Sequence, residues 1–335
     1  MPETCAGLGV LPAGDAAMAA GLLAGDLRSL AKAISLTESR RPDHRLRAQA
    51  MVDALLGHTG KALRVGISGV PGVGKSSFIE TLGLHLLAAG HRVAVLALDP
   101  SSLLAGGSIL GDKTRMEQLS RQDGAFIRPS PAGGALGGLA AHSREALLLC
   151  EAAGYDIVLV ETVGVGQSEA TVASMTDVLV LLQLPNAGDE LQALKKGVLE
   201  VADIVVCNKA DLDAGAAALA SEQLRAALHL VRPRSPHWTP PVLQCSARAD
   251  TGILEVWQAV CRYRDTMRAA GEFDQRRRLQ ALAWMWQTIE HGLRRCFDAD
   301  PAVQDALPPL LDQVAHGGMA PVAAANRLLQ RFQRR

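Results

Sequence analysis

Between residues 62 and 265, short continuous apolar runs alternate with longer stretches whose apolar residues recur at helical spacing. Continuous apolar runs indicate strands that are covered on both faces, and strands interleaved with helices indicate βαβ units. The expected strands are Leu63–Ser68, Arg92–Leu98, Ala125–Arg128, Asp156–Glu161, Val178–Leu184, Asp203–Asn208 and Val242–Cys245. This part of the chain is therefore predicted to be an α/β domain with a doubly wound, mostly parallel sheet.

The residues before this domain, 1–61, show helical spacing and carry no chemical motif. A helix is expected after Pro42, and Asp26 can cap an earlier one with apolar positions at Leu27, Leu30, Ala31 and Ile34. We interpret residues 1–61 as an N-terminal helical extension whose role is packing.

The residues after the domain, 266–335, are also expected to be helical. One apolar seam has the spacing 3, 4, 3, 4, 3 and consists of Leu279, Leu282, Trp286, Ile289, Leu293 and Cys296. Such a seam suits packing along a partner helix or on the protein's own core. The run Arg276–Arg278 is expected to be a solvated helix face, and Pro321 suits the first turn of a last helix. We interpret 266–335 as a C-terminal helical arm that dimerises the protein.

The composition of the 335 residues is that of a foldable, soluble protein, with 48% hydrophobic and 20% charged residues. Lys plus Arg (34) equals Asp plus Glu (34), which argues against a dedicated nucleic-acid binder. The six cysteines are scattered without a C-x-x-C pair, as in a reducing compartment. Apolar runs are shorter than the roughly 20 residues of a membrane helix. We therefore expect a cytoplasmic protein without a membrane segment.

One motif lies between the first expected strand and a helix-forming stretch, Ser76–Ala89. Residues 69–76, GVPGVGKS, match G-x-x-x-x-G-K-[ST] in full. Glycines let successive N–H groups turn inward around a phosphate, and the helix N-terminus adds positive character. Lys75 can reach the β- and γ-phosphates, and the Ser76 hydroxyl can bind Mg²⁺. The expected nucleotide-binding residues here are Gly69, Val70, Pro71, Gly72, Val73, Gly74, Lys75, Ser76 and Ser77, which predicts a P-loop NTPase.

A second motif indicates which base is bound. Asn208-Lys209-Ala210-Asp211 matches N-K-x-D at the end of an expected strand. The Asp211 carboxylate can accept from guanine N1–H and the 2-amino group, whereas adenine lacks that donor pair and leaves the carboxylate unsatisfied. Ser246-Ala247-Arg248 follows the last expected strand and fits a second base-binding loop. Taken singly, Asn208 suits a turn and Asp211 a helix cap; in this order after a P-loop, they favour GTP.

Acidic residues follow other strands of the same sheet. Glu161 ends a buried strand and begins E-x-x-G, in which Gly164 can offer its N–H to the γ-phosphate. A carboxylate there can hold Mg²⁺ directly or through water. Asp99 and Asp112 are further candidates, although an isolated acid at a strand end is often a cap or turn residue. Gln167 is a candidate for orienting water. The candidate catalytic residues are Lys75, Glu161 and Gln167, and the candidate metal ligands are Ser76, Asp99, Asp112 and Glu161.

Several longer stretches resemble one family, the MeaB/ArgK-type GTPases. They are residues 66–76 (GISGVPGVGKS), 98–102 (LDPSS), 106–116 (GGSILGDKTRM), 126–130 (FIRPS), 160–169 (VETVGVGQSE), 188–192 (GDELQ) and 208–211 (NKAD). The resemblance covers nearly the whole chain, including the Leu23–Ala50 helices and the helix with Trp284-Met285-Trp286.

The resemblance implies a chaperone of adenosylcobalamin-dependent acyl-CoA mutases, chiefly methylmalonyl-CoA mutase, which gates cofactor loading and protects the mutase. It also implies a homodimer, Mg²⁺ held by Ser76, Asp99, Asp112 and Glu161, and a mobile third switch at Pro185–Lys196 that contacts the mutase. Spacing alone leaves that loop equally open to interpretation as a solvated helix start.

Two alternative functions remain. A nickel metallochaperone GTPase from a related branch is disfavoured because the nine histidines are dispersed and no Cys pair is present. A kinase or transport ATPase, as relatives have been named, is disfavoured by N-K-x-D. Competition between ATP and GTP would distinguish a kinase from a GTPase. Metal titration would distinguish a nickel metallochaperone from a mutase-associated GTPase.

Overall fold

The structure is a computed structural model that describes residues 11–39, 41–99, 116–131, 136–162, 168–185 and 196–333. Seven strands in these residues form one sheet in the order β3-β2-β4-β1-β5-β6-β7. All of its neighbouring strands are parallel. The strands are β1 (Leu63–Gly69), β2 (Val93–Asp99), β3 (Ala125–Pro131), β4 (Ile157–Thr162), β5 (Val178–Gln183), β6 (Ile204–Cys207) and β7 (Val242–Gln244). The predicted α/β, doubly wound sheet is confirmed, and it is wholly parallel rather than mostly so.

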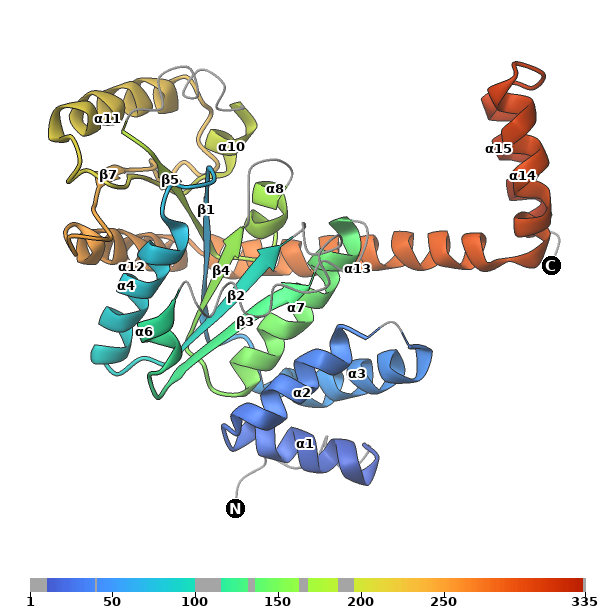
Figure 1. Cartoon of the computed structure of the whole chain (residues 1–335), viewed down its shortest axis with the longest axis horizontal. Coiled ribbons are helices and arrows are strands. Elements are labelled where there is room, and N and C mark those ends of the chain that lie inside the picture. Colours follow the sequence, from blue (N-terminus) through green and yellow to red (C-terminus); the bar gives the residue numbers. More distant parts are fainter. Residues whose placement is uncertain are drawn as a thin grey trace. The chain divides into compact units, whose positions relative to one another are not determined.

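Helices connect the strands and flank the sheet (Figure 1). Those before the sheet are α1 (Ala13–Leu23), α2 (Leu27–Thr37) and α3 (Pro42–Leu55), followed by a 3₁₀ turn, Leu56–His58. Those between the strands are α4 (Lys75–Ala88), α6 (Glu117–Ser120), α7 (Leu136–Ala152), α8 (Ser168–Ala173), α10 (Lys196–Val201) and α11 (Ala214–His229). Those after the sheet are α12 (Ile253–Ala269), α13 (Glu272–Ala299), α14 (Pro301–Ala315) and α15 (Pro321–Gln333).

Alternate residues of the inner strands enter two apolar cores. In β4, Val158 and Val160 face a core shared with α1, α2, α3, α7 and α8. Ile157 and Leu159 of the same strand face a second core that contains the apolar sides of α4 and α12. Burial of both faces explains why the strand sequences are continuously apolar. The two-sided packing fixes the strand ends, where the candidate site lies.

The predicted first helices are present, and a local contact sets the start of α2. Asp26 is its N-cap, and the carboxylate accepts hydrogen bonds from the N–H groups of Arg28 and Ser29. Leu30 and Ile34 are buried, as their spacing predicts. Both α2 and α3 contact α7, which lies between them and the sheet core. The N-terminal extension thus shares its apolar core with the sheet.

The chain divides into two compact units, Met1–Arg278 and Leu279–Arg335, and the boundary falls within α13. In the second unit, α14 and α15 pack on each other through Val303, Leu310 and Leu328. Pro301 begins α14 and Pro321 begins α15, the latter as predicted. No helix in the part of the chain that the structure describes is long and apolar enough to cross a bilayer.

The arginine run at the base of α13 contradicts the prediction of a solvated helix face. Arg277 donates two hydrogen bonds to the buried carboxylate of Asp177, at 2.7 and 2.6 Å. Arg276 pairs with the buried Asp203 at 3.2 Å, and only Arg278 is exposed. The prediction was wrong because the partner carboxylates precede β5 and β6, far away in the sequence, where helical spacing gives no sign of them.

Candidate nucleotide-binding site

The central strand of the sheet carries the phosphate-binding motif. β1 lies between β4 and β5, and the motif joins the carboxyl end of β1 to the N-terminus of α4. The motif N-K-x-D follows β6 at the same edge, because all the strands are parallel. In open α/β sheets, ligands bind at the carboxyl ends of the strands. The topology therefore brings together motifs that lie about 135 residues apart.

At two glycines of the P-loop, both the backbone conformation and a close neighbour exclude a side chain. Gly69 has a φ of 152°, and a Cβ there would lie 2.4 Å from the Leu182 carbonyl oxygen of β5. Gly74 has a φ of 92°, and a Cβ there would lie 2.8 Å from Nδ2 of Asn208. Between them, Pro71 and Gly72 are exposed at the tip of the loop. The loop can therefore present its N–H groups to a phosphate without a side chain in the way.

Lys75, the first residue of α4, folds back over this loop. Its Nζ donates hydrogen bonds to the carbonyl oxygens of Gly69 at 2.8 Å and Val70 at 3.2 Å. The side chain is buried, with 7% of the residue exposed. A buried ammonium must be balanced by acceptors, and phosphate oxygens are stronger acceptors than carbonyls because they are charged. Lys75 is thus held where it can contact a bound phosphate.

Ser76 and Glu161 join the P-loop to β4. The Ser76 hydroxyl donates to Oε1 of Glu161 at 2.9 Å, and Glu161 is 4% exposed. One position further, Thr162 Oγ1 donates to Ser68 Oγ at 3.1 Å. Ser77, in contrast, is exposed. Of the four candidate metal ligands, the structure thus places Ser76 and Glu161 together.

Only one of the other candidate residues near the metal site, Asp99, is among the residues that the structure describes. Asp99 ends β2, two residues beyond Ala97, which pairs with Glu161 in β4. It therefore lies at the same edge of the sheet. Asp112, Gly164 and Gln167 lie outside the described residues. Ser76 and Glu161 supply only oxygen donors, the kind that Mg²⁺ prefers. The described residues therefore fit this ion.

Asn208 connects the three candidate loops of the site. It is 1% exposed, and its Nδ2 donates to the Val73 carbonyl of the P-loop at 2.8 Å. Its Oδ1 accepts from the N–H of Ala247 at 3.1 Å. Asn208 is therefore not a surface turn residue, and its two hydrogen bonds fix the distance between the P-loop and the loop 246–251.

The remaining base-loop residues are arranged around this link. Lys209 has a positive φ of 62°, and Asp211 is exposed. Asp213, rather than Asp211, caps α11 through a hydrogen bond to the Ala216 N–H. The Asp211 carboxylate is consequently not used as the helix cap that its position in the sequence also suggested.

The loop 246–251 is held from two sides. The N–H of Ser246 donates to the Thr251 carbonyl at 2.9 Å, and the reverse bond measures 3.1 Å. The Ala247 carbonyl accepts from Thr81 of α4 at 3.0 Å. Ser246 and Ala247 are buried, whereas Arg248 is exposed. The backbone at Ala247 is thus positioned by the helix that also carries Lys75 and Ser76.

One contact of the site was not foreseen from the sequence. Cys245 donates from its thiol to Asn208 Oδ1, with a sulfur–oxygen distance of 3.4 Å. Burial raises the pKa of Cys245 to about 12, so the thiol stays protonated and can donate. Cys245 directly precedes the Ser246-Ala247-Arg248 loop. This position next to the loop is the feature of the sequence that could have indicated a role for Cys245 in the site.

These features define a P-loop nucleoside triphosphatase with an N-K-x-D sequence that favours guanine. Comparisons with known proteins agree. The profile of the methylmalonyl Co-A mutase-associated GTPase MeaB family matches residues 30–302. A putative GTPase of Caulobacter vibrioides is 53% identical over 93% of this chain and 95% of its own length. The GTPase ArgK of Escherichia coli is 48% identical over 82% of this chain and 83% of its own.

A solved structure and a eukaryotic relative extend these matches. The crystal structure described as a LAO/AO transport system kinase has a TM-score of 0.78 and 36% identity, covering 97% of this chain and 99% of its own. The mitochondrial methylmalonic aciduria type A homolog of Mus musculus is 45% identical over 94% of this chain and 79% of its own length. The chain belongs to the MeaB family and is a GTPase.

Proposed function

We propose that this GTPase is a Mg²⁺-dependent chaperone of an adenosylcobalamin-dependent acyl-CoA mutase of the methylmalonyl-CoA mutase type. In this role it gates loading of the cofactor and protects the mutase. The family match over residues 30–302 carries the assignment of the partner, because the family is described as mutase-associated. We further propose that the protein acts in the cytoplasm.

The hydrogen bond between Ser76 and Glu161 supports a switch mechanism. Glu161 is the last but one residue of β4 and the first residue of the E-x-x-G segment, so its position is coupled to the chain that follows. Any rearrangement of Ser76 around a triphosphate must break or reorganise the 2.9 Å contact. Loops ordered by a γ-phosphate and released on hydrolysis are a common form of such switches.

Mg²⁺ would be held by Ser76 and Glu161, with Asp99 and Asp112 as further ligands, and would neutralise charge on the β- and γ-phosphates. Lys75 would contact the same phosphates after leaving the carbonyls of Gly69 and Val70. Asp211 would read the guanine base, Asn208 would hold the loops in register, and Gln167 would orient the attacking water. We expect slow intrinsic hydrolysis that the mutase accelerates.

The same residues weigh against the alternatives. The solved relative is described as a kinase, yet a phosphoryl transfer to a small molecule does not need a guanine reader, and N-K-x-D supplies one here. We propose that GTP hydrolysis itself, coupled to the mutase, is the function.

The proposed gating can be tested by following transfer of adenosylcobalamin into the apo-mutase spectroscopically. The assay compares this protein with GTP, with a slowly hydrolysed GTP analogue and with ATP. We expect controlled loading with GTP and arrested or uncoupled loading with the analogue. Identical loading under all three conditions would remove the gating role and leave the GTPase assignment intact.

A further inference from the structure

A groove lies between α1, α2 and α3, the three helices that precede the P-loop. Its residues are distant in the sequence from the motifs described above. Its volume is about 530 Å³, and it is lined by residues of α1, α2 and α3. The residues that matter for its chemistry are Met18, Arg28, Lys32, Leu36, His44 and Arg47. Small-molecule sites usually have volumes of about 300–1,000 Å³, so the groove is large enough for an organic ligand.

One end of the groove carries two cationic side chains. Arg28 and Lys32 lie one turn apart on α2 and are exposed. Among the described residues, neither side chain makes a hydrogen bond or an ion pair. The nearby Asp26 carboxylate is occupied, because it accepts from Arg28 N–H, Ser29 N–H and Ser29 Oγ. Two like charges at this spacing repel each other, so an anion between them would be stabilising.

The other end of the groove is fixed and electrically balanced. Arg47 donates two hydrogen bonds to Asp15, at 2.9 and 2.7 Å, and the Asp15 side chain is 2% exposed. The hydrogen bond from Arg47 lowers the pKa of Asp15, so this pair remains charged at neutral pH. The His44 ring is 2.9 Å from Ser39 Oγ and 3.9 Å from Asp43. This end therefore forms a preorganised wall.

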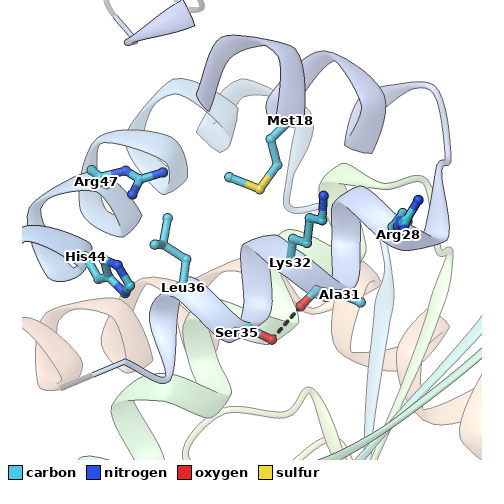
Figure 2. A pocket seen from close by; sticks show the side chains of 8 residues that line it. All are labelled: Met18, Arg28, Ala31, Lys32, Ser35, Leu36, His44 and Arg47. Atoms are coloured by element: carbon cyan, nitrogen blue, oxygen red, sulfur yellow. Dashed lines mark hydrogen bonds between the residues drawn. The ribbon is translucent and has the colours of Figure 1, made fainter. Parts of the chain in front are cut away.

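Apolar side chains lie between the two ends. Leu36 is 7% exposed, and Met18 of α1 is half-buried. Figure 2 shows Met18 between Arg47 and Leu36 on one side and Lys32 and Arg28 on the other. A methionine is adaptable in shape and suits ligands of varied outline. The groove thus combines an apolar middle with a cationic end.

We propose that this groove binds a small amphipathic organic anion, with its carboxylate or phosphate group at Arg28 and Lys32 and its hydrocarbon portion against Met18 and Leu36. The face of α2 next to the groove is also tied to the sheet. Arg128 of β3 donates to Ser35 Oγ at 3.1 Å and pairs with Glu38. A ligand in the groove would consequently contact a helix, α2, that is hydrogen-bonded to the sheet of the nucleotide-binding domain.

The test uses the full-length protein labelled with [¹³C-methyl]methionine, with the Met18 signal assigned through Met18→Leu. Hexyl phosphate and hexanoate are titrated separately, and inorganic phosphate serves as the anion without an apolar part. We expect a saturable shift of the Met18 signal with at least one of the two amphipathic anions, and at least about tenfold weaker binding of inorganic phosphate. A response to hexyl phosphate alone indicates a phosphate ester, and a response to hexanoate alone indicates a carboxylic acid.

Substitutions distinguish specific binding in the groove from non-specific attraction of anions to the protein surface. The double variant Arg28→Gln/Lys32→Gln should weaken binding at least about tenfold, because it removes the charge-assisted contacts. Arg45→Gln, which removes one positive charge at an exposed position of α3 outside the groove, should leave binding unchanged. No saturable shift with either amphipathic anion would overturn the proposal. Equal affinity for inorganic phosphate, or undiminished binding by the double variant, would overturn it as well.

Discussion

The side-chain amide of Asn208 donates a 2.8 Å hydrogen bond to the carbonyl of Val73, joining the N-K-x-D segment to the P-loop. Its oxygen simultaneously accepts from Ala247 and Cys245. One buried amide therefore sets the spacing of three loops that come from widely separated parts of the sequence. Its contacts leave little room nearby, which explains the need for glycine at position 74.

Gly74→Ala should impair nucleotide binding as well as stability. The new Cβ meets both an unfavourable φ of 92° and the Asn208 amide at 2.8 Å. Gly90→Ala is the matched control, since its φ is 89° and a Cβ there has no neighbour within 4 Å. The backbone strain alone costs about 1–2 kcal/mol. We expect Gly90→Ala to show that loss with unchanged GTP affinity, and Gly74→Ala to lose more stability and at least about tenfold in affinity. Equal behaviour of the two variants in urea unfolding and nucleotide titration would contradict the role of Asn208.

Asp211→Asn should change which base is bound. The amide no longer accepts both guanine donors, so GTP affinity should fall by about 10- to 100-fold. Because the amide can instead donate to a carbonyl at the 2-position, xanthosine triphosphate should bind better than GTP. Asp213→Asn is the control, since asparagine can still cap α11 through Ala216. Unaltered preference for GTP in the Asp211 variant, measured by competition, would show that another group reads the base.

Arg277→Ala should destabilise the first unit strongly. It leaves the carboxylate of Asp177, with 1% of its side chain exposed, without the two hydrogen bonds from the guanidinium. Loss of one partner of a buried ion pair costs about 3 kcal/mol or more. The exposed neighbour supplies the control, because Arg278→Ala should cost less than about 0.5 kcal/mol. Urea unfolding of both variants measures the difference, and similar midpoints would show that the pair at Asp177 contributes little.

Trp286→Arg should disrupt self-association. Trp286, Leu293 and the other apolar seam residues of α13 are exposed in the single chain, at 59% for each of these two. We infer that a partner helix covers the seam, because apolar residues at this spacing suit packing along a second helix. A charge there should convert the proposed dimer into a monomer in sedimentation experiments, while Arg295→Glu, outside the seam, should leave it dimeric. A wild-type protein that sediments as a monomer would contradict the proposal directly.

The sequence predicted the sheet well because its strands are buried on both faces. The expected Leu63–Ser68 became β1, Leu63–Gly69, and the expected Val242–Cys245 became β7, Val242–Gln244. Motifs with strict local geometry, such as the P-loop, could also be recognised. The pairing of Arg277 with Asp177 could not, because a charge pattern within one helix says nothing about a carboxylate 100 residues away.

The candidate site was predicted in part for the same reason. Parallel strands necessarily bring their carboxyl ends to one edge, so the proximity of Ser76 and Glu161 followed from the pattern. The hydrogen bond of the Cys245 thiol could not be predicted in this way, because a cysteine in an apolar strand normally contributes only to packing. Its hydrogen bond depends on the placement of Asn208, which only the folded chain defines.

The proposed function is tested most directly by GTP hydrolysis by the purified protein, alone and with an adenosylcobalamin-dependent acyl-CoA mutase, with ATP as the control nucleotide. We expect slow hydrolysis of GTP, negligible hydrolysis of ATP and an increase in the GTP rate when the mutase is added. A GTP rate that every such mutase leaves unchanged would contradict the proposed partnership.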